Sequence, residues 1–155
     1  MSKLKDIHIL TEAEYNTLQT ISQNDLYFVE DSQSGWTIFS ELKTILQESP
    51  VATGTPTAYT LSDLPDGSGE YELLLCATAV SGTASGNLCR VNLYPTNDVD
   101  NVAYAAACRT RSSSAVEDRA TFVYPMKGNI IYADIEGTAG KGTGYLWWYG
   151  YRQIG

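Results

Sequence analysis

The sequence predicts a mainly β protein, in which a C-terminal antiparallel β-sandwich or jelly roll follows a small α+β module and a short helical oligomerisation segment. The 155 residues include 11 tyrosines and 13 glycines, a composition typical of strands joined by tight turns. From about residue 58 onward, short runs of strand-forming residues alternate with turn sequences at roughly regular spacing. The clearest apolar pattern at helical spacing lies in residues 36–49.

The N-terminal module, residues 1–35, is expected to contain a strand, a helix and a second strand. Thr11 is a good N-cap, and Glu14 completes the capping-box pattern T-x-x-E, which predicts a helix from residue 12 to about residue 20. The run Leu-Tyr-Phe-Val at residues 26–29 consists of strong strand formers. Because a unit of this size rarely builds its own core, we expect it to dock on something larger.

Residues 36–49 are predicted to form an amphipathic helix that ends before Pro50. An isolated helix of about 12–15 residues is marginal in water, so its apolar stripe must be buried. It can pack against the same helix in other copies of the chain or against the β domain of its own chain, and we expect the former. The expected oligomer-interface residues of the stripe are Ile38, Phe39, Leu42, Ile45 and Leu46.

The remaining chain is expected to be a linker, residues 50–57, and a β-sandwich head, residues 58–155. The linker is rich in Thr, Gly and Pro, and the strongest turn signal after it is Pro65-Asp66-Gly67. Seven short strands over about 95 residues fit an antiparallel sandwich. The expected strands cover residues 59–61, 70–80, 88–94, 101–109, 120–124, 129–136 and 143–154.

The last predicted strand carries large side chains on both faces, so both faces should be covered. One face of this strand carries Tyr145, Trp147 and Tyr149 at alternate positions. We expect a neighbouring subunit to cover this face, so these three side chains are expected at an oligomer interface. Trp147 and Trp148 are also candidates for contact with a glycan. The competing interpretation is burial in the core and between subunits, since aromatic side chains are enriched in both settings.

Charge and composition exclude several partners. Eighteen acidic residues against 10 basic residues give a net charge of −8, which disfavours nucleic acid. We expect neither a signal peptide nor a membrane-spanning segment. Three cysteines, Cys76, Cys89 and Cys108, lie in apolar runs and are expected to be buried, reduced thiols of a protein made in a cytosol. One pair could still form a bridge if strands bring it together.

No residue set indicates catalysis, a metal site or a cofactor. His8 is the single histidine and is distant in sequence from every cysteine. The acidic turn at residues 97–101 lacks the last carboxylate of a calcium loop. The adjacent carboxylates Glu117 and Asp118 are expected to point apart, unlike a glycosidase pair. The glycine-rich segment 137–144 does not match a phosphate loop and is expected to be a hairpin turn.

One stretch carries a family resemblance. Residues 7–18 read I-x-x-L-T-x-x-E-Y-x-x-L and residues 26–29 read L-Y-F-V. This arrangement resembles the N-terminal segment of bacteriophage virion fibre proteins, over about a fifth of the chain. The closing run from Gly144 to Gly155 also looks like the last strands of phage fibre head domains. The residues that the resemblance implies in anchoring to the particle are Ile7, Leu10, Tyr15, Leu18, Leu26, Tyr27 and Phe28.

The resemblance implies a virion protein, made in the cytoplasm of the host bacterium, with an attachment module, a trimerising region and a distal β domain. Such fibres often continue into a long repetitive shaft, which this sequence lacks, so a short homotrimeric head fibre that decorates the capsid fits better than a long tail fibre. Its expected partners are two further copies of itself and the major capsid protein or another virion protein. The alternative is a tail fibre or receptor-binding module that recognises carbohydrate on the host surface.

Overall fold

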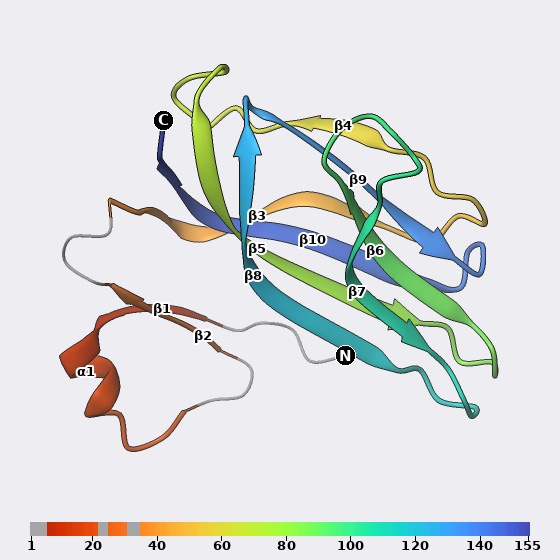
Figure 1. The fold of residues 1–155 in the computed structure, drawn as a ribbon. Helices are drawn as coiled ribbons and strands as arrows, with labels where there is room; N and C mark the ends of the chain where they lie inside the picture. The colour runs from red at the N-terminus through yellow and green to blue at the C-terminus, as the bar shows by residue number, and fades with distance from the viewer. Residues whose placement is uncertain (1–5, 22–24, 31–34) are drawn as a thin grey trace.

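The computed structural model describes residues 6–21, 25–30 and 35–155. Within these ranges the chain forms a β-sandwich and, beside it, a small N-terminal unit (Figure 1). The sandwich is built from eight strands in two four-stranded sheets. Their bounds are β3 Thr37–Glu48, β4 Thr57–Thr60, β5 Glu70–Ser81, β6 Leu88–Tyr94, β7 Ala103–Arg109, β8 Glu117–Lys127, β9 Ile130–Gly137 and β10 Gly142–Gln153. The predicted antiparallel β-sandwich is therefore confirmed.

The strand order is β3-β10-β5-β8 in one sheet and β4-β9-β6-β7 in the other. All pairings within the two sheets are antiparallel. Alternate residues of the inner strands meet in the core between the sheets, and each of the following side chains is at most 2% exposed: Leu73, Leu75, Val91, Leu93, Ile131, Ile135 and Leu146. This alternation of buried and exposed positions explains why period-two patterns located these strands in the sequence.

The helix predicted over residues 36–49 is wrong, because Thr37–Glu48 is the edge strand β3. Its partner is β10, in the register Leu46↔Leu146 and Ile38↔Gly150. Register shifts interrupt this pairing in two places, between Leu146 and Trp147 and between Trp148 and Gly150. Each irregularity changes which face the following residues occupy. The apolar residues of β3 consequently lose the period of two and imitate helical spacing.

The segment predicted as a linker, residues 50–57, packs against the sandwich instead. Pro50 is buried, and Val51 forms an isolated parallel bridge with Glu136 of β9. The Val51 amide donates to the Ile135 carbonyl at 3.0 Å, and the Gly137 amide donates to the Val51 carbonyl at 2.8 Å. The domain boundary therefore does not fall at residues 50–57, since β3 on one side of this segment and β4 on the other belong to the same sandwich.

Strand β8 runs longer than the expected residues 120–124, because it begins at Glu117 and continues through Pro125 to Lys127. Proline has no backbone N–H to donate to a neighbouring strand, but it is tolerated in an edge strand, where alternate residues direct their N–H to solvent. In this sheet β8 is an edge strand, with Pro125 opposite Glu72 of β5.

The N-terminal unit has the predicted order of strand, helix and strand: β1 Ile7–Thr11, α1 Glu12–Asn16 and β2 Leu26–Glu30. The strands pair in parallel, in the register Ile7↔Leu26 to Thr11↔Glu30. The helix is shorter than the residues 12–20 that the sequence suggested. The five-residue helix α1 and the two five-residue strands make this unit smaller than a domain that usually builds its own core, in line with the size argument from the sequence.

Candidate functional site

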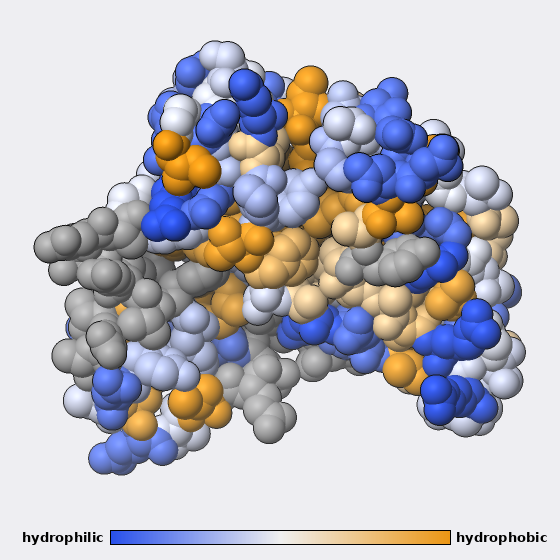
Figure 2. Space-filling model, in the orientation of Figure 1, coloured by the Kyte–Doolittle hydropathy of each residue, from blue (hydrophilic) through white to orange (hydrophobic). Residues whose placement is uncertain are grey.

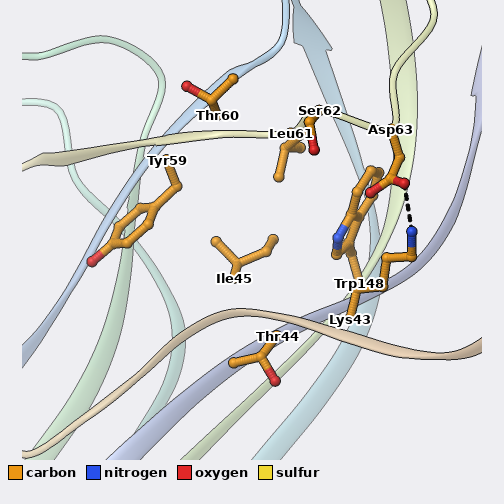
Figure 3. Close-up of a pocket in the computed structure, with 9 residues that line it drawn as sticks. All are labelled: Lys43, Thr44, Ile45, Tyr59, Thr60, Leu61, Ser62, Asp63 and Trp148. Carbon is orange, nitrogen blue, oxygen red and sulfur yellow. Dashed lines mark hydrogen bonds and ion pairs between the residues drawn. The ribbon is translucent and has the colours of Figure 1, made fainter.

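One cleft of the sandwich lies where the edge of one sheet meets the edge of the other, between β3 and β4. It encloses about 240 Å³, and β10 contributes to it beside β3 (Figure 3). Its lining combines two aromatic rings with aliphatic, hydroxyl and charged side chains. The lining residues are Lys43, Thr44, Ile45, Tyr59, Thr60, Leu61, Ser62, Asp63 and Trp148.

The two aromatic rings stand on opposite sides of the cleft, with Ile45 between them (Figure 3). Tyr59 is half-buried, and burial together with the nearby carboxylates of Glu48 and Asp134 raises the pKa of its phenol. The phenol is therefore protonated at neutral pH and can donate a hydrogen bond. Trp148 is only 3% exposed, so only a small part of its indole lines the cleft.

An ion pair lies at the end of the cleft next to Trp148 (Figure 3). Lys43 Nζ is 2.5 Å from Asp63 Oδ1 and 4.3 Å from the centroid of the Phe39 ring. Both side chains of the pair are more than a third exposed, so the pair contributes about 1 kcal/mol or less to stability. Its importance is positional, because it presents an ammonium and a carboxylate beside an aromatic ring.

The loop that carries Ser62 and Asp63 is held firmly. Leu61 and Leu64 on either side of it are buried in the core, at 4% and 6% exposure. The Leu64 amide also donates to the Leu61 carbonyl at 3.2 Å, and the Leu61 amide donates to the Asn129 carbonyl at 2.8 Å. The cleft is consequently formed before any ligand arrives, which lowers the entropy cost of binding.

The two tryptophans proposed for glycan contact do not share a site. Trp148 is a core residue, whose indole meets the Phe39 ring edge-on at a centroid distance of 4.6 Å. Trp147 is half-buried on the opposite face of β10, where it stacks on Tyr145 with the ring centroids 5.0 Å apart. Adjacent residues of a strand point to opposite faces, so a joint site of both indoles is ruled out.

The residues predicted for an oligomer interface are also dispersed. Tyr149 is fully buried within the single chain and is unavailable to a neighbouring subunit. Leu46 belongs to the core, with Phe39 and Ile45 packed against it, because β3 completes the sheet. Ile38, Leu42, Tyr145 and Trp147 are half-buried and keep some exposed surface.

The predicted anchoring residues come together in the N-terminal unit. Tyr27 lies at its centre, stacked on His8 at a centroid distance of 4.7 Å and meeting Tyr15 edge-on at 6.0 Å. His8 Nε2 lies 3.0 Å from Asp25 Oδ2, a contact within this unit. Leu18 is 37% exposed, while Ile7, Leu10 and Leu26 are half-buried. The backbone of Phe28 pairs with β1, and its side chain lies outside the described residues.

The N-terminal unit lies against the outer face of the sheet that contains β5 and β8. An apolar cleft of about 210 Å³ separates the two parts, lined by Leu26 and Tyr27 on one side and by strand residues on the other. The strand residues are Leu74, Leu75, Thr121, Phe122, Val123 and Tyr149.

A buried polar network on the outer face of the other sheet was not foreseen from the sequence. Asn92 Nδ2 donates to Asp134 Oδ1 at 2.8 Å and to Glu136 Oε2 at 3.2 Å, while the Tyr94 hydroxyl donates to Asp134 Oδ2 at 2.9 Å. Glu136 also forms an ion pair with Arg90. The network explains how polar residues at alternate positions of β6 and β9 can be buried. The sequence signal that could have revealed this network is the alternation of polar residues at 90, 92 and 94 in β6 and at 134 and 136 in β9.

Among the residues that the structure describes, no group of three or more His, Cys, Asp and Glu side chains could hold a metal ion. The described part of the chain also contains no helix with the length and apolarity needed to cross a membrane.

No family model and no curated protein matches this chain. Among solved structures, it is similar to the CBM22-1–GH10 modules of Clostridium thermocellum endo-1,4-β-D-xylanase 10B complexed with xylohexaose, at 13% identity and a TM-score of 0.35, over 78% of this chain and 26% of that one. The CBM22-1 xylan-binding domain of Paenibacillus barcinonensis Xyn10C matches at 20% identity and a TM-score of 0.28, over 81% and 89% of the two chains.

A family 6 carbohydrate-binding module from Clostridium cellulolyticum, in complex with xylose, matches at 17% identity and a TM-score of 0.26, over 76% and 92% of the two chains. The chain thus spans about a quarter of the first of these structures. At these scores we draw no functional conclusion from the likeness, and the β-sandwich assignment stands on the strand pairings themselves.

Proposed function

We propose that this chain is a receptor-binding protein of a bacteriophage particle, in which the β-sandwich binds carbohydrate in the β3–β4 cleft and the N-terminal unit anchors the chain to the virion. The observation that carries the binding function is the lining of the cleft. Tyr59 and Trp148 lie on either side of Ile45, and the Lys43–Asp63 pair lies beside Trp148.

This lining matches the chemistry of a sugar ring. A pyranose has an apolar C–H face, which packs on aromatic and aliphatic side chains, and hydroxyl groups around its edge. Hydroxyls both donate and accept, so they can pair with an ammonium, a carboxylate and other hydroxyls. The cleft supplies all three kinds through Lys43, Asp63 and Ser62. A preformed cavity with an apolar floor and a few polar groups is the usual form of a small-ligand site.

The anchoring function rests on the resemblance of residues 7–29 to the attachment segment of phage fibres. The strand–helix–strand order of that segment agrees with a compact docking unit. Its small size means that a larger surface must supply much of its burial. The virion location, the host bacterial cytoplasm as the place of synthesis and the capsid or other virion protein as partner belong to this proposal.

The binding function is tested by screening the full-length chain on an array of bacterial surface glycans and by measuring the affinity of each hit by calorimetry. Tyr59→Ala should weaken binding about 10-fold, equivalent to about 1.4 kcal/mol. Asp63→Asn should also weaken binding, because it removes the carboxylate acceptor. Tyr132→Ala is the matched control, since Tyr132 is a half-buried tyrosine of the neighbouring strand β9 that lines a different cleft. Binding that survives Tyr59→Ala but falls with Tyr132→Ala would place the site elsewhere.

A second candidate function is a purely structural fibre, a short homotrimer that decorates the capsid. Figure 2 shows apolar side chains gathered across the middle of the face in view, and Val123 of the edge strand β8 is 48% exposed. An exposed apolar edge of this kind favours contact with another subunit. Sedimentation equilibrium of the full-length chain tests it. A trimer without any glycan hit would favour the structural fibre, and a monomer that binds glycan would favour the receptor-binding function alone.

A further inference from the structure

We propose that Cys89 and Cys108 are a disulfide-forming pair, which joins β6 to the edge strand β7 when the protein folds under oxidising conditions. The two cysteines are direct partners in the antiparallel register of these strands. Directly opposite residues project from the same face of a sheet, with Cα atoms about 4.5–5.5 Å apart. Disulfides span Cα separations of about 4.4–6.8 Å, so the backbone already has the required spacing.

Both thiols turn toward the interior of the sandwich. Cys89 is fully buried and Cys108 is 7% exposed. The Cys108 thiol lies 3.2 Å from the carbonyl oxygens of both Ala79 and Val116, either of which can accept its hydrogen bond. The third cysteine, Cys76, lies in β5 of the other sheet, where its strand partners are Trp147 and Thr121. It has no cysteine opposite it, so the register selects one pair of the three possible.

Burial makes the thiols of the folded protein unreactive. It raises the pKa of Cys89 to about 11, with the neighbouring Cys108 as a further cause, and it also raises the pKa of Cys108. Only the thiolate reacts in disulfide exchange, so little reaction is expected in the intact sandwich at neutral pH. Strand β7 is an edge strand, hydrogen-bonded to β6 within its sheet, and can separate more readily than a central strand. The bridge should therefore form during folding or when β7 opens.

The chemistry is thiol–disulfide exchange with oxidised glutathione. The thiolate of one cysteine attacks the glutathione disulfide, forms a mixed disulfide and releases one glutathione thiolate. The thiolate of the second cysteine then attacks the protein sulfur of the mixed disulfide and releases the second glutathione. Two electrons pass from the protein thiols to glutathione disulfide, and the two thiol protons end on the two glutathione molecules.

The bridge would close a loop through residues 89–108, which includes the exposed turn at residues 95–101. A closed loop restricts the unfolded chain and so raises the urea concentration needed for unfolding. It would also fix the edge strand β7 to its partner β6.

The test is to unfold the full-length chain in urea with a reductant, to refold it with oxidised and reduced glutathione, and to count thiols after denaturation. The expected result is one remaining thiol, assigned to Cys76, and an intact mass lower than that of the reduced chain by two hydrogen atoms. Peptide mapping should link Cys89 to Cys108, and the urea midpoint should rise relative to the reduced chain. Three remaining thiols, a link to Cys76 or stable glutathione adducts would each overturn the proposal.

Two variants keep the test informative. Cys76→Ala should give the same link with no remaining thiol. Cys108→Ala should remove the link, and its urea midpoint should be the same in oxidising and reducing buffer. If the midpoint of the unmodified chain rises under oxidation but that of Cys108→Ala rises equally, the stabilisation has another source and the proposal fails.

Discussion

The placement of β3 inside the sandwich can be tested with two leucines that a helix would treat alike. Leu42 and Leu46 are four residues apart, so they would share one face of a helix. In the structure Leu46 is 5% exposed and belongs to the core, whereas Leu42 is half-buried and lies outside the core cluster. Truncation of a buried leucine to alanine costs about 2–5 kcal/mol, because contacts are lost and a cavity remains.

Leu46→Ala should therefore lower the free energy of unfolding by about 3 kcal/mol, and Leu42→Ala by less than about 1 kcal/mol. For a chain of this length, about 3 kcal/mol corresponds to a fall in Tm of about 6–12 °C. Urea titration and thermal melts followed by circular dichroism measure both variants, at two protein concentrations tenfold apart. Equal losses for the two variants, growing on dilution, would show that the segment is an oligomer-forming helix and would refute the assignment of β3.

Three further predictions follow from the same architecture. Gly54→Val should lower the free energy of unfolding by about 1–3 kcal/mol, because a Cβ there would lie within 2.9 Å of three polar atoms of the buried network. Gly67→Ala should change the urea midpoint little, because the atom nearest to the added Cβ would be 3.6 Å away. Burial and a neighbouring carboxylate raise the pKa of Tyr94 from 10.0 to about 12, so the folded state favours the protonated phenol. The stability that this phenol contributes is present below pH 10 and is lost as the pH rises toward about 12. In Tyr94→Phe the urea midpoint should therefore depend less on pH over that range. A fragment of residues 35–155 should keep the near-ultraviolet circular dichroism spectrum of the sandwich. A fragment of residues 55–155 lacks β3 and should lose this spectrum or aggregate. An intact spectrum for the shorter fragment would mean that β3 is dispensable.

The strands from β4 onward could be predicted because local signals agree with the tertiary structure. The Pro65-Asp66-Gly67 turn and the glycine-rich turn at residues 137–142 separate runs whose alternate residues are buried. In β6, for example, Val91 and Leu93 face the core and are at most 2% exposed. Such agreement makes both the existence and the bounds of a strand readable from the chain.

The error at β3 arose from the period of its apolar residues. Leu46 pairs with Leu146, but the next pair is Thr44 with Trp147, so Ile45 is the extra residue of a bulge. Ile45 and Leu46 can therefore both pack on the core although they are consecutive, and the pattern no longer has a period of two. The β-branched residues of this segment were the available evidence for a strand, and the three-and-four spacing outweighed them.

The candidate site could not be predicted because it depends on pairings between distant parts of the chain. Lys43 and Asp63 come from segments on either side of the supposed linker and meet only because β3 and β4 are edges of opposed sheets. Trp148 reaches the cleft from the far end of the sequence, since β10 inserts between β3 and β5. None of these residues forms a motif with its sequence neighbours. A correct assignment of β3 would have been the necessary first step, because β3 supplies the wall of the cleft against which Tyr59 and Asp63 are placed.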